Sequence, residues 1–235
     1  GGYTGMTPQD YRNYVLQLAA KVNFPADKII LGGDHLGPLT FSHLPAEDAM
    51  AEAEELIRQF VAAGFTKIHI DTSMRLGGDD PNVKLDPKLI AERGARLALA
   101  AEAAFAELKA ENPDAPLPVY VVGSEVPIPG GSQEEDDQVQ VTTVADFQET
   151  VTLFNDAFIN LGLADAWERV IAVVVQPGVE FGNESIHPYS REAAAELCQA
   201  LKAYPNLVFE GHSTDYQTPD CLRQMVEDGI VFLKV

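Results

Sequence analysis

The stretch ILGGDHLGP, residues 30–38, joins a short apolar run to the polar pair Asp34 and His35 through two glycines. The same order, an apolar and often β-branched run that ends in glycine or a polar residue, returns along the chain. Continuous apolar runs of this length are typical of strands that are buried on both faces, as in a parallel sheet. The pattern predicts six strands, over residues 28–32, 67–71, 119–123, 170–175, 207–210 and 231–235.

Amphipathic and often alanine-rich stretches separate these runs, which indicates an alternation of strands and helices. Thr7, Asp86 and Thr218 each precede a proline, and this order of capping side chain and proline is preferred at a helix start. Ser190 is a further capping candidate. We predict helices over residues 8–22, 46–63, 87–111, 144–161, 191–204 and 219–228.

Repeated strand–helix units form either an open doubly wound sheet or a closed barrel. The chain has no GxGxxG and no GxxxxGK followed by Ser or Thr, the usual nucleotide signatures of a doubly wound sheet. Polar residues follow nearly every predicted strand, as a barrel with one active face requires. We therefore predict an α/β fold, a (β/α)8 TIM barrel, with residues 1–235 as a single domain that holds strands three to eight. The first two strands are expected before Gly1, and the last strand end and helix after Val235.

The 235-residue chain is strongly acidic, with a formal net charge of −20 and 46% hydrophobic residues. This hydrophobic content suits a sizeable core and excludes disorder of the whole chain. The charge disfavours nucleic acid and anionic membranes as partners, so a sugar phosphate would need a local cation. Two separated cysteines, Cys198 and Cys221, and the lack of a long apolar run or signal pattern predict a cytoplasmic protein without a membrane span.

Asp34 and His35 are the first candidates for chemistry, because they are adjacent at a glycine-rich strand end. An imidazole nitrogen binds divalent metals, and a neighbouring carboxylate can exchange a proton with a sugar hydroxyl. We expect Gly32, Gly33 and Gly37 to form a flat loop that lets substrate approach. For an isolated pair of this kind the alternative is an Asp cap beside a surface histidine.

Acidic, amide, hydroxyl and imidazole side chains follow the other predicted strands. They are Asp71, Ser73, Glu125, Gln176, Glu180, Glu210, His212, Ser213 and Asp215. Capping alone does not account for such groups at five strand ends, and the carboxyl ends of barrel strands meet at one face. Two histidines and one or two carboxylates from separate strands would form an open metal site with nitrogen and oxygen ligands.

Simpler interpretations apply to the remaining polar residues. His69 lies inside its strand and is interpreted as a hydrogen-bonded interior histidine, and His43 and His187 as solvated loop residues. Lys234 ends the last strand, where a lysine binds phosphate or, less often, forms a Schiff base. The acidic run at residues 134–137 fits a solvated loop, with a lid as the alternative.

Six motifs occur in order along the chain: GGYTGM, ILGGDHLGP, KIHIDTSM, GSEVPIPGG, VIAVVVQPGVEF and VFEGHSTDYQT. On these motifs the chain closely resembles the non-catalytic (Z) subunit family of D-tagatose-1,6-bisphosphate aldolase, whose members are also labelled tagatose-6-phosphate kinases. The resemblance spans essentially all 235 residues. It implies a barrel of the class II aldolase type that acts in the catabolism of galactitol, N-acetylgalactosamine or related hexoses.

The resemblance also implies a divalent metal ion, with Zn²⁺ first and Mn²⁺ or Ni²⁺ as alternatives. By motif, Asp34 is similar to the acid–base residue, His35 and His212 to the metal ligands, and Glu125 to a supporting carboxylate with catalytic and metal-binding roles. Where a further histidine ligand is expected, this sequence has Gln176, which weakens metal affinity and independent turnover. We also expect substrate contacts from Asp71, Ser73, Gln176, Ser213, Asp215 and Lys234.

Three functions follow from these residues and this resemblance. The first is an accessory subunit that stabilises a catalytic class II aldolase subunit, with that subunit, further copies of this chain, or both as partners. The second is metal-dependent chemistry of its own on a ketohexose or its phosphate, by retro-aldol cleavage or 4-epimerisation, with Asp34 or Glu125 moving the proton. The third is the kinase of the family label, although the characteristic phosphate-cradling loops are missing from the sequence.

Overall fold

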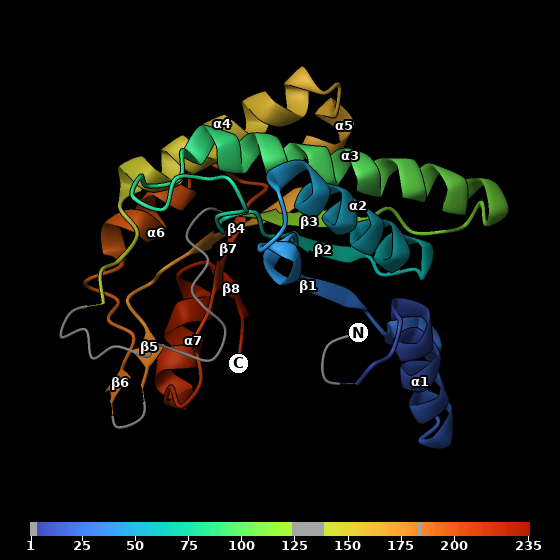
Figure 1. Ribbon diagram of the computed structural model, residues 1–235. Helices are drawn as coiled ribbons and strands as arrows, with labels where there is room; N and C mark the ends of the chain where they lie inside the picture. The colour runs from blue at the N-terminus through green and yellow to red at the C-terminus, as the bar shows by residue number, and fades with distance from the viewer. Residues whose placement is uncertain (1–3, 124–138, 183–184) are drawn as a thin grey trace.

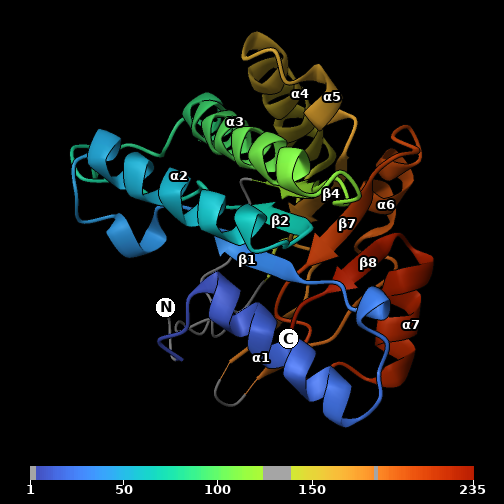
Figure 2. The same cartoon turned by 90° about the vertical axis from the view of Figure 1, so that its right-hand side faces the viewer.

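A single curled sheet of six parallel strands organises the protein, of which the computed structural model describes residues 4–123, 139–182 and 185–235. The strand order is β1-β2-β3-β4-β7-β8, and Figure 1 and Figure 2 show the curl from two directions. The strands are β1 (Gly32–Leu36), β2 (Lys67–Ile70), β3 (Val119–Val122), β4 (Val170–Val175), β7 (Val208–Gly211) and β8 (Ile230–Leu233). Each predicted strand has a counterpart here, and the parallel pairing is confirmed.

Helices cover the outer side of the curled sheet (Figure 2). Helix α2 packs against β1, α3 against β2 and α7 against β8, while α2, α3 and α4 lie side by side. The helices are α1 (Pro8–Lys21), α2 (Ala46–Ala62), α3 (Pro87–Glu111), α4 (Val144–Asn160), α5 (Ala164–Trp167), α6 (Ala195–Leu201) and α7 (Pro219–Glu227). Within the described ranges, none of them is long and apolar enough to cross a membrane.

The predicted caps position three of these helix starts. Thr7 Oγ1 accepts a hydrogen bond from the backbone N–H of Asp10 at 3.2 Å, and the capping box is complete. Asp86 Oδ1 accepts from Lys88 N at 2.9 Å, and Thr218 Oγ1 accepts from Cys221 N at 3.2 Å. Each cap satisfies a backbone donor that the first helical turn leaves without an intrahelical partner.

Helix α6 starts later than predicted. The expected start was residue 191, but the α-helix begins at Ala195. Ser190 Oγ does accept from Ala193 N at 3.3 Å, so the serine closes a turn ahead of the helix. The short helix α5 and the antiparallel pair β5 (Glu180–Phe181) and β6 (Ile186–His187) were not predicted.

The bounds of the first strand differ most from the prediction. Lys28 ends a short 3₁₀ helix, η1 (Ala26–Lys28), and Ile30 is 81% exposed. The strand starts at Gly32 because β2 sets its ladder, in which Gly32 pairs with Lys67. An apolar run therefore gave the wrong start, since pairing and not hydropathy decides where a strand begins.

The expected glycine loop is also wrong in part, because Gly32 and Gly33 belong to strand β1. Position 37 needs a glycine for close packing and not for a flat loop. A Cβ atom at Gly37 would lie 1.7 Å from the carbonyl oxygen of Asp71, so only glycine allows β1 and the end of β2 to approach this closely. A second 3₁₀ helix, η2 (Leu39–Phe41), follows this crossing.

Alternation along the strands divides their side chains between two faces. Ile68 and Ile70 of β2 and Phe209 of β7 belong to the large core under the helices. A second, small apolar cluster forms around Val121, Ala172 and Val174, with partly buried Val208 and Phe232 against it. Residues that alternate with the helix-facing ones, such as His69 and Glu210, therefore point to the inner face of the curl.

The outer strands of the sheet are β1 and β8, and no ladder joins them within the described residues. The observed architecture is a curled, open arc of parallel strands with helices outside. Closure into a (β/α)8 barrel stays a prediction.

Candidate functional site

Polar side chains from four strands converge on the inner face near the carboxyl end of the sheet. Residues two apart along a strand face the same side, which brings pairs such as His69 and Asp71 to one place. We call this group the carboxyl-end cluster; its members are Asp34, His35, Lys67, His69, Asp71, Glu210, His212 and Lys234.

His35 sits at a distortion of β1. Its φ is +45°, in the left-handed region, and the register to β2 shifts between Gly33 and Leu36. The ring Nδ1 lies 3.0 Å from Asp71 Oδ2. Because a carboxylate only accepts hydrogen bonds, this partner assigns the proton to Nδ1 and leaves a lone pair on Nε2. A metal ligand is commonly oriented by a carboxylate in this way.

Asp71 is in turn fixed by Ser73. The Ser73 hydroxyl donates to Asp71 Oδ1 at 2.7 Å and the Ser73 backbone N–H donates at 3.1 Å. Burial acts to raise the pKa of Asp71, but the hydrogen bonds from His35 and Ser73 outweigh it and lower that pKa. Asp71 is therefore a carboxylate that holds His35, which is a more specific role than the predicted substrate contact.

His69 is fully buried, and its ring faces two carboxylates. Nδ1 lies 3.2 Å from Asp34 Oδ1 and 3.1 Å from Glu210 Oε1. Burial acts to lower the pKa of His69, but the hydrogen bonds to Asp34 and Glu210 raise it. Its Nε2 is buried without a hydrogen-bond partner among the described residues. The predicted interior position and the hydrogen-bonded ring are confirmed through Nδ1. The lack of a partner at Nε2 was not predicted, and such an atom is uncommon in a native core.

Glu210 links the histidines to a lysine. It is fully buried, with Oε1 3.0 Å from His212 Nε2 and Oε2 2.8 Å from Lys67 Nζ. Burial acts to raise the pKa of Glu210, but hydrogen bonds from His212 and His69 hold it well below its usual range. Burial lowers the pKa of His212, and the charge of Lys234 adds to this, so His212 is held neutral.

Asp34 is the most accessible member, with 55% of its side chain exposed. Lys234 Nζ lies 2.6 Å from Asp34 Oδ1 and 2.7 Å from His35 Nε2. Burial acts to raise the pKa of Asp34, but the bonds from His69 and Lys234 hold it well below its usual range. Asp34 is thus ionised at neutral pH, the form that accepts a proton, and it becomes a stronger base once the bonds from His69 and Lys234 are released.

Three imidazoles gather in this cluster. The ring centroids of His35 and His69 are 4.8 Å apart, those of His35 and His212 4.9 Å, and those of His69 and His212 5.7 Å. One ligand atom from each lies within 4.8 Å of the others. Nitrogen ligands about 2.1 Å from one tetrahedral Zn²⁺ lie about 3.4 Å apart, so the three rings would have to move together by about 1 Å to reach one ion. This donor set and the orphaned His69 Nε2 fit a divalent metal.

Most predicted site residues take a place in or beside the cluster, although their roles remain predictions. Asp34, His35, His212, Asp71 and Lys234 are brought together. Ser73 is attached through Asp71, and Ser213, with φ +53°, directly follows His212. Within the described residues, no hydrogen bond or ion pair joins Asp215 to the cluster. Glu125 and the acidic run at 134–137 lie outside the described residues.

Gln176 has a local structural task. Its Oε1 accepts hydrogen bonds from Gly178 N at 2.9 Å and Val179 N at 3.0 Å, which caps the turn after β4. Glu180 Oε1 likewise accepts from its neighbour Phe181 N at 3.0 Å. A substrate contact by Gln176 stays a prediction.

Two parts of the site are not evident from the sequence prediction. It gives His69 only an interior position, and it assigns no role to Lys67. The period of two in KIHID carried the signal: Ile68 and Ile70 face the helices, so Lys67 and His69 point to the inner face. Glu210 was noted at its strand end but not assigned a role.

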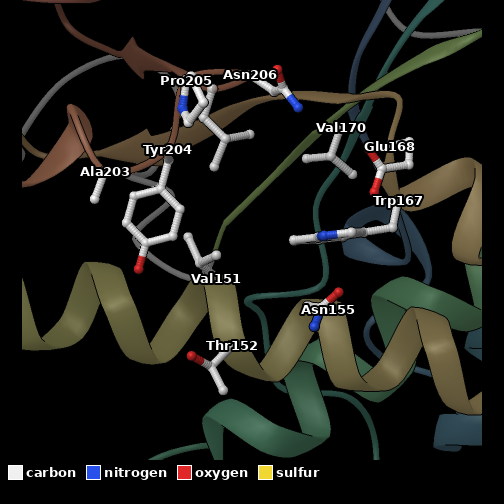
Figure 3. Close-up of a pocket in the computed structure, with 11 residues that line it drawn as sticks. Val151, Thr152, Asn155, Trp167, Glu168, Val170, Ala203, Tyr204, Pro205 and Asn206 are labelled. Carbon is white, nitrogen blue, oxygen red and sulfur yellow. The ribbon is translucent and has the colours of Figure 1, made fainter.

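A hollow of about 390 Å³ lies at the opposite end of the sheet, among α4, α5 and the starts of β4 and β7. Figure 3 shows the rings of Trp167 and Tyr204 on two sides of it, with Val151 and Asn155 on α4. Glu168 is the one carboxylate in its lining within the described part of the chain. We call it the amino-end pocket.

Comparison with known proteins gives a family match over the whole chain. The model of the family described as D-tagatose-1,6-bisphosphate aldolase subunit GatZ/KbaZ-like matches residues 1–235. Among solved structures, a probable tagatose 6 phosphate kinase from Sinorhizobium meliloti 1021 is 46% identical with a TM-score of 0.86. The likeness covers 100% of this chain and 54% of that one, so the chain spans about half the length of that relative.

Two structures from Escherichia coli are similar at greater distance. The 3-keto-D-glucoside 4-epimerase YcjR, in its apo form, is 11% identical with a TM-score of 0.47, over 97% of this chain and 77% of that one. The homocysteine methyltransferase MmuM, also apo, is 18% identical with a TM-score of 0.44, over 88% and 72%. These likenesses are too distant to indicate a function.

Proposed function

The chain belongs to the D-tagatose-1,6-bisphosphate aldolase subunit GatZ/KbaZ-like family, and on this premise we propose that it is an accessory subunit that stabilises a catalytic class II aldolase partner. The reaction would be the cleavage of a ketohexose phosphate in carbohydrate catabolism. Support comes from the family's subunit description and from a carboxyl-end cluster of the kind that class II aldolase chemistry uses. A cytoplasmic setting and a sugar phosphate as ligand are parts of the same proposal.

The observation that carries the metal part of this proposal is the convergence of His35, His69 and His212 beside the ionised Asp34. We propose that the three imidazoles hold a divalent ion, with Zn²⁺ first and Mn²⁺ or Ni²⁺ as alternatives. Such an ion would supply Lewis-acid polarisation of a sugar carbonyl. His69 replaces the ligand that is missing at Gln176, and a role for Glu125 remains part of the prediction.

The surrounding residues would orient and move protons. Asp71 holds the Nδ1–H of His35, which keeps Nε2 directed into the site. Asp34, exposed and ionised, would take a proton from a sugar hydroxyl. Lys234 supplies a cation in a strongly acidic protein, which suits a phosphate group. Ser213 and Asp215 would contact the sugar from the loop after β7.

The test is a mixing experiment with the full-length protein. A catalytic class II aldolase subunit is incubated alone and with this protein. Its activity in cleaving tagatose-1,6-bisphosphate is followed over time, and the half-life of that activity is measured. We expect a longer half-life on mixing and no cleavage by this protein alone. Equal half-lives with and without it would rule out the accessory role.

A second candidate is turnover by this protein itself, which the exposure of Asp34 beside three histidines favours. It would be retro-aldol cleavage or 4-epimerisation of a ketohexose or its phosphate. The assay uses tagatose and fructose phosphates with added Zn²⁺, Mn²⁺ or Ni²⁺. We expect the variant Asp34→Asn to lower any such rate by about 10²- to 10⁴-fold. Unchanged turnover in that variant would remove Asp34 as the proton-transfer group.

The kinase activity in the name of the Sinorhizobium meliloti relative finds no support in the residues of this chain. Phosphoryl transfer from ATP needs a phosphate-cradling loop and carboxylates that hold Mg²⁺. The sequence has no characteristic loop of that kind.

A further inference from the structure

The Lys234 ammonium group lies in the carboxyl-end cluster among several groups that attract a cation. Its Nζ lies 2.6 Å from Asp34 Oδ1, 2.7 Å from His35 Nε2 and 3.7 Å from Glu210 Oε1. An ammonium group only donates hydrogen bonds, so it meets the lone pair of His35 Nε2. That lone pair is the one that a metal ion would take, since His35 Nδ1–H is bonded to Asp71.

The charges of the cluster are consistent with a lysine ammonium group that occupies the position of a metal cation. The cluster holds three carboxylates, Asp34, Asp71 and Glu210, and two ammonium groups, Lys67 and Lys234. Counted with all three imidazoles in the neutral form that binds a metal ion, these groups carry one net negative charge in a partly buried place. A divalent ion that took the place of the Lys234 ammonium would balance these charges, whereas an ion added beside it would leave an excess positive charge, and unbalanced buried charge is costly.

The Lys234 side chain can leave without disturbing the fold, because its backbone is fixed. Lys234 N–H donates to Gly211 O at 3.0 Å, and Lys234 O accepts from Thr214 N at 3.0 Å and from Thr214 Oγ1 at 2.8 Å. The side chain carries four rotatable methylene groups and lies at the end of β8 with 19% exposure. Only rotamer changes separate the bound and released ammonium group.

Lys67 provides an internal comparison. Its Nζ lies 2.8 Å from Glu210 Oε2 and 4.9 Å from the centroid of the Phe232 ring. These contacts place it on the far side of Glu210 from the imidazoles. It carries the same charge at the same cluster, but its contacts are with Glu210 and Phe232 and not with the ring nitrogens of the three imidazoles.

We propose that Lys234 is a built-in competitor of the metal: its ammonium group caps His35 Nε2 and Asp34 until a divalent ion displaces it. The proposal rests on the proposed metal site. It makes Lys234 a residue that sets the metal affinity of the protein and that becomes free to meet an anion only after metal has bound.

The first test measures Zn²⁺ and Mn²⁺ affinity by calorimetry for the wild type, Lys234→Met and Lys67→Met, each stripped of metal. Methionine keeps the length and the apolar stem but removes the charge. We expect Lys234→Met to lower the metal Kd at least tenfold, about 1.4 kcal/mol, and Lys67→Met to change it less than threefold. Equal gains in both variants would mean that only the local charge matters, and they would overturn the proposal.

The second test needs no substitution. Lys234 is labelled with an amine-reactive acetylating reagent in the wild type, with and without saturating Zn²⁺, and the labelled peptides are quantified by mass spectrometry. We expect labelling of Lys234 to rise at least fivefold with Zn²⁺ and labelling of Lys67 to stay constant. Labelling of Lys234 that is unchanged or lower with Zn²⁺ contradicts the exchange.

The outcomes distinguish a failure of the competition by Lys234 from a failure of the metal site itself. Metal binding with equal Kd in the wild type and Lys234→Met, and with unchanged labelling, overturns the competition by Lys234 and leaves the metal site standing. A lack of metal binding in both proteins contradicts the exchange and the metal site together.

Discussion

The carboxyl-end cluster and the amino-end pocket lie at opposite ends of the same strands, yet they gather different side chains. The cluster holds several titratable groups within hydrogen-bond distance of one another, such as His69, Glu210 and His212. The pocket offers about 390 Å³ among side chains such as Val151, Trp167 and Tyr204. The candidate site is therefore indicated by converging titratable groups and not by the presence of a hollow.

The largest expected difference between the two ends concerns stability. Glu210→Ala leaves Lys67 and two buried imidazoles without their carboxylate, which should lower the free energy of unfolding by about 3–5 kcal/mol. Glu168→Ala, at the exposed rim of the amino-end pocket, should change it by less than about 0.5 kcal/mol. Urea unfolding of both variants in the presence of a chelator measures this. A similar loss of stability in the two variants would mean that the two ends of the sheet do not differ in this respect. The variant Glu210→Gln keeps the shape of the side chain and serves as the control for the loss of charge.

The next effect is on metal affinity. Asp71→Asn removes the charge that orients the Nδ1–H of His35, and changes of this kind typically weaken metal binding about 10- to 100-fold. Asn155→Ala in the amino-end pocket should leave the metal Kd unchanged. Calorimetry with Zn²⁺ on both variants checks the pair. An unchanged Kd in Asp71→Asn would show that His35 is not oriented through Asp71.

The pH dependence of stability should distinguish two histidines within the cluster. The pKa of His69 is raised from 6.5, so the folded protein keeps a proton that the unfolded chain releases, and stability falls as the pH rises above 6.5. The pKa of His212 is lowered from 6.5, so the unfolded chain binds a proton first, and stability falls as the pH drops below 6.5. Each slope is at most about 1.4 kcal/mol per pH unit, the effect of one proton.

Urea unfolding between pH 5 and pH 8, without metal, tests these two slopes. His69→Asn should flatten the alkaline side of the stability maximum, and His212→Asn the acidic side. No change of slope in either variant would contradict the assigned directions. The lowered pKa values of Asp34, Asp71 and Glu210 add stability that is present above their ordinary values and is lost only as the pH falls below about 4.

The smallest expected effect on metal binding comes from a change at the amino-end pocket. Trp167→Ala removes an edge-to-face contact with Phe158, whose ring centroid is 5.6 Å away, and aromatic pairs of this kind contribute about 0.5–1.5 kcal/mol. The free energy of unfolding should fall by about that amount beyond the lost packing area, with no change in metal Kd. A shift of the metal Kd in this variant would show that the amino-end pocket and the carboxyl-end cluster are coupled and do not act independently.

Much of the fold was predictable because strands and helices carry local signals. The caps at Thr7, Asp86 and Thr218 marked helix starts, and apolar runs marked six parallel strands. The start of β1 was not predictable, because pairing of Gly32 with Lys67 depends on a residue 35 positions away. Closure of a barrel is likewise a property of the whole sheet and not of any one segment.

For the site, the sequence by itself determined which residue types stand at the strand ends, Asp34, His35 and His212 among them, because a parallel sheet sends its carboxyl ends to one edge. Only the tertiary structure decided that His69 joins them with an orphaned nitrogen, and that Lys234, 199 residues from His35, covers its Nε2. The physical reason is range: periodicity and capping act over a few residues, whereas protonation states and cation positions are set by charges that meet only when the sheet curls.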